Sequence, residues 1–332
     1  MHAYAALSDR VVAVRTARSS HCAQTSDWTV FEALGAYTPT CIAASSDAPE
    51  RAFTGTADSG LHRSVDGGRT WGRVGAFTDR ITAVTVSPHD LDEVWVGTEP
   101  SAVSRSVDGG IHWELRPGLT DLPSADRWSF PPRPHTHHVR WLECDPHESD
   151  TLYVAIEAGA FVRTTDAGES WLDHPDGARR DNHTIATHPD SPGRVYSAAG
   201  DGYAESSDGG NTWNYPQTGL DHRYVWGLAV DPGDPDTVVV SAANGARTAH
   251  RIAQAESYVY RRNGSDWQLA MEGLPAPQGT TRAVLAAGTV DGEFLALTNH
   301  GLFRSLDAGQ SWTRLDIDWD GDAVGRGVVV VG

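Results

Sequence analysis

The sequence contains no lysine, so its 26 basic residues are all arginine, against 44 acidic residues and a net charge of −18. A protein face that binds nucleic acid needs a surplus of basic side chains to replace the counterions of the phosphate backbone. We therefore expect no nucleic-acid partner. The acidic, lysine-free composition suggests a salt-adapted or GC-rich source, with plain codon bias as the alternative, and the sequence leaves both readings open.

Cysteine is scarce, and long apolar runs are missing. Cys22, Cys41 and Cys144 are an odd number without the spacing of a metal site, so we expect free thiols in a reducing compartment. Residues 1–10 have neither the basic start nor the apolar core of a signal peptide. No apolar stretch approaches the length of a transmembrane helix. We expect a monomeric, cytoplasmic protein without membrane contact.

Several catalytic signatures are also missing, including the HExxH zinc motif, the Walker loop, the dinucleotide fingerprint and the serine nucleophile elbow. The sequence has instead a recurring segment with the pattern Ser/Thr-x-Asp-x-Gly-x-x-Trp. Its hydroxyl and carboxylate can hydrogen-bond the backbone of a tight turn, and its glycine can adopt the backbone conformation that such a turn needs. The aspartates of the five copies are Asp66, Asp108, Asp166, Asp208 and Asp307.

The tryptophans of these turns repeat along the whole chain. Two weaker copies, Ser26-Asp27-Trp28 and Ser265-Asp266-Trp267, extend the series. The seven turn tryptophans are Trp28, Trp71, Trp113, Trp171, Trp213, Trp267 and Trp312. They are separated by steps of 43, 42, 58, 42, 54 and 45 residues. A period near forty among short strands indicates a propeller or a solenoid.

These turns resemble Asp boxes, and the chain is similar to the BNR/Asp-box repeat proteins. That group includes sialidases, sortilin-type receptors and photosystem-assembly factors, and it is related in architecture to other repeat propellers of the WD40 and YVTN kind. The resemblance covers nearly the whole sequence and implies a β-propeller. It implies little about function, because the box is a structural turn and one fold supports many activities.

The repeats predict an all-β fold, a seven-bladed β-propeller of four-stranded antiparallel blades, as a single domain over residues 1–332. One blade is divided between the two ends. Residues 1–34 supply its three outer strands and residues 324–332 its innermost strand, so that the ring closes without exposed sheet edges. The other six blades are expected at residues 35–76, 77–117, 136–174, 181–217, 222–271 and 280–316.

Alignment of the innermost strands places polar residues where each strand begins, at the mouth of the central channel. One position is occupied by Thr40, Thr82, Arg140, His183, Trp226, Arg282 and Arg326. The position two residues earlier is occupied by Arg80, His138, Asp181, Tyr224 and Thr280. Charged groups are costly to bury unless they are paired or used. Their convergence predicts a ligand site, and the alternative is a set of solvated rim residues.

Two long insertions are expected on the same face, opposite the Asp boxes. Residues 120–136 are rich in proline and carry Trp128 and Phe130, and residues 244–257 interrupt a hairpin. Long ordered loops on a rigid scaffold commonly carry function. The alternative is sequence drift in surface loops.

The candidate residues suit three kinds of chemistry. The guanidinium groups could bind a carboxylate, sulfate or phosphate, and the candidate substrate-binding residues are Arg140, Arg282, Arg326, Arg80, Trp226, Trp128 and Arg223. Acid–base catalysis needs groups that hold or move a proton, and the candidate catalytic residues are His138, His183, Tyr224, Asp181 and Glu157. Imidazoles also suit a divalent metal ion at the channel mouth, and the candidate ligands are His138, His183 and His222, with Glu157 or His300 as an optional further ligand.

The family resemblance suggests a further comparison. Sialidases grip a sialic-acid carboxylate with three arginines, and Tyr224 with Glu157 would parallel their Tyr/Glu nucleophile pair. The sequence departs from sialidases because it lacks an Arg-Ile-Pro motif near the N-terminus and predicts seven blades instead of six. Two functions follow: a hydrolase or lyase acting on a small anionic or sugar-like molecule, with or without a metal, and a non-catalytic scaffold that binds protein or peptide.

Overall fold

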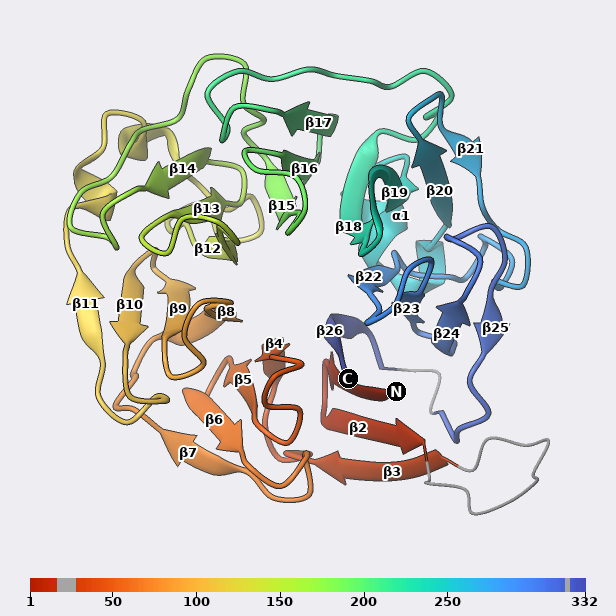
Figure 1. The fold of residues 1–332 in the computed structure, drawn as a ribbon, viewed down its shortest axis with the longest axis horizontal. Helices are drawn as coiled ribbons and strands as arrows, with labels where there is room; N and C mark the ends of the chain where they lie inside the picture. The colour runs from red at the N-terminus through yellow and green to blue at the C-terminus, as the bar shows by residue number, and fades with distance from the viewer. Residues whose placement is uncertain (17–27, 320–322) are drawn as a thin grey trace.

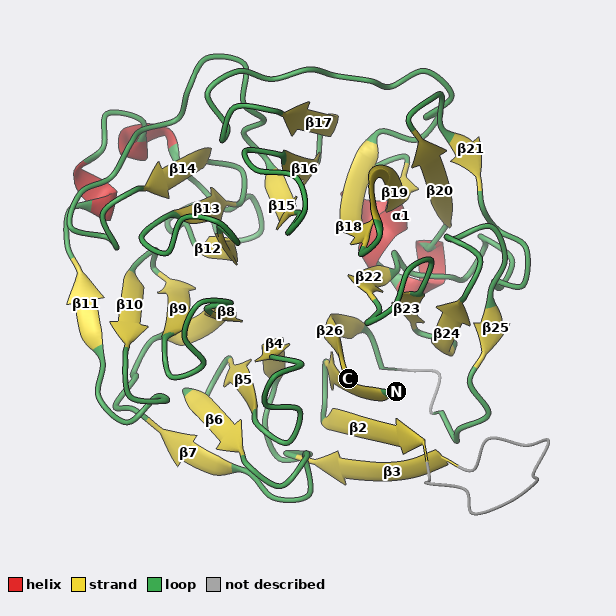
Figure 2. Cartoon of the chain, in the orientation of Figure 1, coloured by secondary structure: helices red, strands yellow, loops and turns green. Residues whose placement is uncertain are grey.

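The computed structural model describes residues 1–16, 28–319 and 323–332, which form seven antiparallel sheets around a central axis (Figure 1). The predicted all-β, seven-bladed propeller is confirmed. Cys22 and the Ser26-Asp27 part of the first weak repeat lie outside the described residues. The described helical segments all lie in loops (Figure 2), and they are η1 (Leu119–Asp121), η2 (Ala125–Arg127), α1 (Ala246–His250) and η3 (Ile252–Gln254). None of them is long and apolar enough to span a bilayer.

Each sheet runs from an innermost strand at the axis to an outer strand at the rim. The sheet that joins the chain ends contains β26 (Gly325–Val331), β1 (His2–Leu7), β2 (Val11–Thr16) and β3 (Trp28–Ala33). The next contains β4 (Pro39–Ala44), β5 (Ala52–Thr56), β6 (Leu61–Ser64) and β7 (Gly72–Val74). The third contains β8 (Arg80–Val86), β9 (Val94–Glu99), β10 (Val103–Ser106) and β11 (Glu114–Arg116).

The remaining four sheets complete the ring. Two have three strands, namely β12 (Val139–Cys144), β13 (Leu152–Ile156) and β14 (Ala160–Thr164), then β15 (Asn182–Thr187), β16 (Val195–Ala199) and β17 (Gly202–Ser206). The sixth contains β18 (Tyr224–Asp231), β19 (Asp234–Ala243), β20 (Ser257–Asn263) and β21 (Gln268–Leu269). The last contains β22 (Val284–Ala287), β23 (Phe294–Thr298), β24 (Gly301–Ser305) and β25 (Thr313–Arg314).

The prediction of four strands in every blade is wrong for the two three-stranded sheets. Their outer position is reduced to single bridges, between Arg163 and Leu172 and between Glu205 and Asn214. In both blades a proline, Pro175 or Pro216, follows within three residues of the bridge. Proline has no N–H to donate to a strand ladder, but Pro117 follows the fourth strand β11 at the position equivalent to Pro175, so proline alone does not account for the shorter sheets.

The predicted closure of the ring is confirmed, because β26 pairs with β1 in the sheet that also contains β2 and β3. His2 lies opposite Val331, and Tyr4 lies opposite Val329. Apolar side chains of this sheet pack with those of the β22–β25 sheet in one buried cluster. The core is thus divided among neighbouring blades, which explains how a chain of 332 residues avoids one large central core.

The Asp boxes form the expected turns. Ser64 Oγ accepts the N–H of Gly68 at 2.9 Å and donates to Asp66 Oδ1 at 2.9 Å, and Asp66 Oδ1 accepts the N–H of Thr70 at 2.9 Å. Equivalent bonds recur at Asp108, Asp166, Asp208 and Asp307. Gly68 has φ 85°, and a Cβ there would lie 2.5 Å from that of Ala13 on the neighbouring blade. Both the backbone and the packing between blades therefore require glycine.

The Asp-box carboxylates should make the fold sensitive to acid. Hydrogen bonds from the side chain and backbone of Thr70 lower the pKa of Asp66 from 3.8 to about 2, and those of Ser170 do the same for Asp166. A carboxylate with a lowered folded pKa stabilises the protein above its unfolded pKa, and this contribution is lost as the pH falls through the folded pKa. We expect the free energy of unfolding, measured with urea, to fall between about pH 4 and about pH 2. Asp208→Asn should reduce that fall, and a flat wild-type curve would contradict the prediction.

Candidate functional site

The innermost strands share an irregularity at the position where the sequence predicts site residues. In six of these seven strands the pairing register shifts, so that the strand contains a bulge. A bulge bends the strand and redirects the unpaired side chain, and such features are frequent beside functional sites. The residues at the bulges are Thr40, Thr82, Arg140, His183, Trp226 and Arg326. In the remaining blade, Arg282 lies two residues before β22.

Side chains at this register also connect one blade to the next. His183 Nδ1 donates to the carbonyl of Val225 at 2.7 Å, and Arg282 Nη2 donates to the carbonyl of Gly325 at 2.8 Å. Each acceptor directly precedes the bulged residue of the following blade. The bond sets the tautomer of His183: with the proton on Nδ1, the neutral ring has a lone pair on Nε2. His183 is fully buried, and its Nε2 has no hydrogen-bond partner among the described residues.

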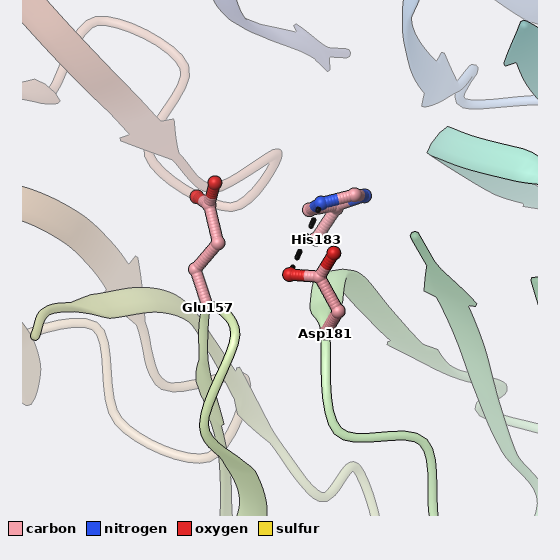
Figure 3. Close-up of side chains that lie close together, drawn as sticks. All are labelled: Glu157, Asp181 and His183. Carbon is pink, nitrogen blue, oxygen red and sulfur yellow. Dashed lines mark ion pairs between the residues drawn. The ribbon is translucent and has the colours of Figure 1, made fainter. Parts of the chain in front are cut away.

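Two carboxylates converge beside this free nitrogen (Figure 3). Glu157 directly follows β13, and Asp181 directly precedes β15. His138 Nε2 donates to Glu157 Oε2 at 3.1 Å, whereas His183 Nε2 lies 3.6 Å from Asp181 Oδ1, beyond hydrogen-bond distance. Asp181 Oδ1 accepts the N–H of Ala158 at 2.8 Å. The Asp181 side chain is 35% exposed, so solvent reaches the cluster at this carboxylate.

The surroundings of the two carboxylates push their pKa values apart. Burial raises the pKa of Glu157, but the hydrogen bond from His138 and the positive charge of nearby basic groups such as Arg140 outweigh burial and lower it to about 2. Burial also raises the pKa of Asp181, and the charge of Glu157 raises it further. Burial lowers the pKa of His183, although Asp181 opposes this effect. Neighbouring groups with such divergent pKa values are suited to general acid–base chemistry.

Two arginines pack against Trp226. The Cζ atoms of Arg140 and Arg282 lie 4.6 Å and 4.8 Å from the centroid of its ring. Arg140 Nε lies 3.7 Å from Glu157 Oε2. Arg282 is 1% exposed, and its Nε and Nη1 have no hydrogen-bond partner among the residues described. Burial lowers the pKa of both arginines, and the charge of Arg326 lowers that of Arg282 further.

These groups together form the channel-mouth site, which we define as Arg140, Glu157, Asp181, His183, Trp226 and Arg282. It draws on four neighbouring sheets, from the one that begins with β12 to the one that begins with β22. The innermost strands of these sheets contact one another in sequence around the axis (Figure 1). Because buried cations favour a nearby negative charge, the arginine side of the site is suited to an anion.

Both long insertions pack on this site. Phe130 meets His138 edge to face with ring centroids 4.6 Å apart, and His250, at the end of α1, lies 4.3 Å from Trp226. The Tyr224 hydroxyl and His250 Nε2 share a hydrogen bond at 3.1 Å. Burial, together with the charge of Arg282, lowers the pKa of His250 to about 2. The sequence analysis selected the insertion over residues 244–257 but did not include His250 among the site residues. A histidine in a loop expected over the channel mouth could have indicated it.

Other predicted site residues make different contacts. Burial raises the pKa of Tyr224, whose hydroxyl bonds to His250 and not to Glu157 as in the sialidase parallel. Trp128 is buried and donates from Nε1 to Ser124 Oγ at 3.0 Å, so it cannot serve as an exposed aromatic anchor.

The predicted arginines at the edge of the site differ in exposure. Arg80 Nε lies 3.7 Å from Glu99 Oε2, which ties this arginine to a carboxylate of its own blade. Arg223 is exposed to solvent. Arg326 is also exposed, yet surrounding protein and the charges of Arg140 and Arg80 lower its pKa. Such a combination fits a side chain in a solvent-filled part of the channel.

Among the described histidines, cysteines and acidic residues, one group brings three ligand atoms within 4.8 Å of one another: Glu157, Asp181 and His183. The metal set predicted from the sequence shares only His183 with this group. His138 bonds to Glu157 instead, and His222 stacks on Tyr258 with ring centroids 3.9 Å apart. Glu157 was considered only as an additional ligand to the histidines, and Asp181 was not among the predicted ligands.

Comparisons with known proteins identify the fold and leave the family open. No protein-family model matches the sequence, and no curated protein matches it. An ancestral GH74 enzyme superposes with a TM-score of 0.67 and 16% identity over 85% of this chain and 39% of that one. The GH74 xyloglucanase of Xanthomonas campestris gives 0.63 and 16% identity over 93% and 52% of the two chains. YCF48 bound to D1 peptide gives 0.60 and 17% identity over 88% and 92%.

The extent of these matches limits what they show. The chain spans 39% and 52% of the two GH74 enzymes, so it corresponds to part of each. Identities of 16–17% establish a common fold and no shared activity. The protein is therefore a seven-bladed β-propeller that is structurally similar to GH74 enzymes and to YCF48.

Proposed function

We propose that the channel-mouth site binds a small anionic or sugar-like molecule and acts on it as a hydrolase or a lyase. One observation carries this proposal. Arg140 and Arg282 are buried against Trp226 with N–H groups that have no hydrogen-bond partner among the described residues, and Arg140 Nε lies 3.7 Å from Glu157 Oε2. A bound anion would satisfy these donors and supply the missing counter-charge.

The residues divide into a binding part and a proton-transfer part. Arg140 and Arg282 would hold a carboxylate, sulfate or phosphate group through directed N–H donors. Asp181, with its raised pKa and partial exposure, is suited to donate a proton to a leaving group. Glu157, ionised through its bond with His138, is suited to act as a base or to stabilise positive charge. An acidic sugar would suit both parts, and the similarity to a xyloglucanase supports a carbohydrate.

Anion binding should be visible as a shift in thermal stability. Sulfate, phosphate or a small carboxylate should raise the melting temperature by mass action, because they bind the folded protein. Chloride at matched ionic strength should do less, since screening does not distinguish one anion from another. A triple variant with Arg140, Arg282 and Arg326 changed to glutamine should lose this response. Its melting temperature in anion-free buffer should be lower than that of wild type, because it also loses the Arg282–Gly325 hydrogen bond and the Arg140–Glu157 ion pair, so each protein is compared with its own anion-free baseline. The matched control is Arg69→Gln, an exposed arginine of an Asp-box turn that should keep the response. Equal responses of wild type and triple variant to sulfate would contradict an anion site.

Turnover requires a separate measurement with acidic oligosaccharides. A hydrolase releases new reducing ends, whereas a lyase also produces an unsaturated sugar that absorbs ultraviolet light. Asp181→Asn should abolish either reaction while leaving the sulfate response in place, because the arginines remain. If the sulfate response is present and no acidic sugar is turned over, the binding half of the proposal stands and the catalytic half fails.

A peptide-binding scaffold is the second candidate function. It is favoured by the match to YCF48 over most of both chains, in a structure that contains a bound peptide. The burial of Trp128 removes the aromatic anchor that the sequence suggested for such a partner. A peptide that binds wild type and the triple arginine variant with equal affinity would support the scaffold. A peptide whose binding is lost in the triple variant would instead be a ligand of the channel-mouth site.

A further inference from the structure

We propose that Glu157, Asp181 and His183 bind a divalent transition-metal ion of the Zn²⁺ or Mn²⁺ type. The inference does not depend on the anion-binding arginines of the function proposed above, because different side chains hold the metal and the anion. It does share Glu157 and Asp181 with the proton-transfer part of that function, so a bound ion would replace the acid and base roles of these two carboxylates. The three candidate ligands come from two adjacent blades, with Glu157 after β13 and the other two at the start of β15 (Figure 3).

The geometry of the three side chains fits a shared ion. Their ligand atoms lie within 4.8 Å of one another, and His183 Nε2 lies 3.6 Å from Asp181 Oδ1. Two ligands that are each about 2.1 Å from a zinc ion lie about 3.4 Å apart at the tetrahedral angle. The observed separation is too long for a hydrogen bond and close to this metal-bridged value. Small side-chain movements would bring all three ligands to bonding distance.

Each of the three side chains is already oriented by a hydrogen bond, and each keeps a lone pair with which it can coordinate a metal ion. His183 donates from Nδ1 to Val225, which directs the lone pair of Nε2 toward the carboxylates. Glu157 accepts from His138, and Asp181 accepts the N–H of Ala158. Outer hydrogen bonds of this kind orient metal ligands in known sites. The free Nε2 belongs to a side chain with 0% exposure, so no solvent molecule at the surface accounts for it.

The charges and the donor types narrow the class of ion. Glu157 and Asp181 repel each other across a mostly buried space, and a dication between them would remove that repulsion. One imidazole with two carboxylates suits Zn²⁺, Mn²⁺ or Fe²⁺, whereas Mg²⁺ and Ca²⁺ prefer oxygen ligands alone. Arg140 Nε lies 3.7 Å from Glu157 Oε2, and the position of its guanidinium over Trp226 gives its charge a second partner when an ion occupies the carboxylates.

Metal binding can be measured directly on the full-length protein, freed of purification tags and treated with EDTA. Titration calorimetry with Zn²⁺ should show one ion per chain, and Co²⁺ in its place should give a visible absorption spectrum with nitrogen and oxygen ligands. Glu157→Gln and Asp181→Asn should each weaken Zn²⁺ binding at least about 10-fold. His183→Asn should do the same while its amide keeps a donor for the carbonyl of Val225.

A matched control separates this site from adventitious binding. Asp201→Asn changes an exposed carboxylate of the neighbouring turn, which pairs with Arg179, and it should bind Zn²⁺ as wild type does. Circular dichroism of every variant establishes that it is folded. Absence of saturable Zn²⁺ and Co²⁺ binding to wild type would overturn the proposal. Binding that persists unchanged in Glu157→Gln and Asp181→Asn would also overturn it. The effect of sulfate on the melting temperature is a separate measurement, so the anion proposal and the metal proposal can each fail without the other.

Discussion

Deletion of residues 325–332 should abolish the cooperative unfolding of the propeller. The deletion removes β26, exposes the edge of β1 and uncovers the apolar cluster shared with the β22–β25 sheet. Val330 and Val331 are buried, and a buried valine contributes about 1.5–3 kcal/mol. With the lost ladder hydrogen bonds, the total reaches about 5 kcal/mol or more, comparable with the about 5–15 kcal/mol that stabilises a typical protein.

Thermal denaturation followed by circular dichroism provides the measurement. The truncated protein should melt at least about 10 °C below the full-length chain, or without a cooperative transition. A synthetic peptide of residues 323–332, added in excess, should restore part of the lost stability by pairing with β1. A truncated protein that melts like the full-length chain would show that the closing strand contributes little.

Replacement of Glu157 by alanine should cause the second large loss. Its carboxylate accepts from His138 and lies 3.7 Å from Arg140, and both of these residues are buried. Removal of one side chain from a buried cluster of charged residues leaves the opposite charges without a partner, and this typically costs about 3–5 kcal/mol of folding free energy. We expect a loss of this size in urea denaturation, together with the loss of any turnover at the channel-mouth site.

Two control variants show whether the charge is responsible. Glu157→Gln keeps an acceptor of the same shape, so it should destabilise less than Glu157→Ala. Glu148→Ala removes an exposed carboxylate from the same blade and should leave the stability within about 0.5 kcal/mol of wild type. An unchanged free energy of unfolding for Glu157→Ala would mean that water replaces the carboxylate without cost.

The fold could be predicted because its signal is local and repeated. Each Asp box uses its own hydroxyl, carboxylate and glycine, as at Ser64, Asp66 and Gly68, so the turn can be recognised without knowledge of its neighbours. The loss of the outer strand in two blades was overlooked. It leaves no mark in the Asp-box repeat itself, since Pro175 follows its turn tryptophan at the same distance as Pro117, which lies in a four-stranded blade.

The site could be predicted only in part, because its contacts join blades far apart in the sequence. Alignment of strand starts selected Arg140, His183 and Trp226, which the structure brings together. It could not show that Glu157 bonds to His138, since hydrogen-bond partners depend on how loops fold back on strands. The alignment also could not show that His222 lies apart from His138 and His183, because the His222 ring stacks on Tyr258 of the adjacent hairpin.

The bulges also suggest how such a propeller can change its ligand. The backbone of a bulge residue is not paired in the strand ladder, so substitution of its side chain leaves the pairing of the blade intact. The repeated fold thus presents a panel of interchangeable positions, one from each of six blades, around a common space. At His183 the exchange is restricted to side chains that still donate to the next blade. At Arg140 exchange would also remove a partner of the mostly buried Glu157. A combinatorial library that varies the remaining bulge positions and keeps His183 and Arg140 would sample new specificities with the smallest risk to folding.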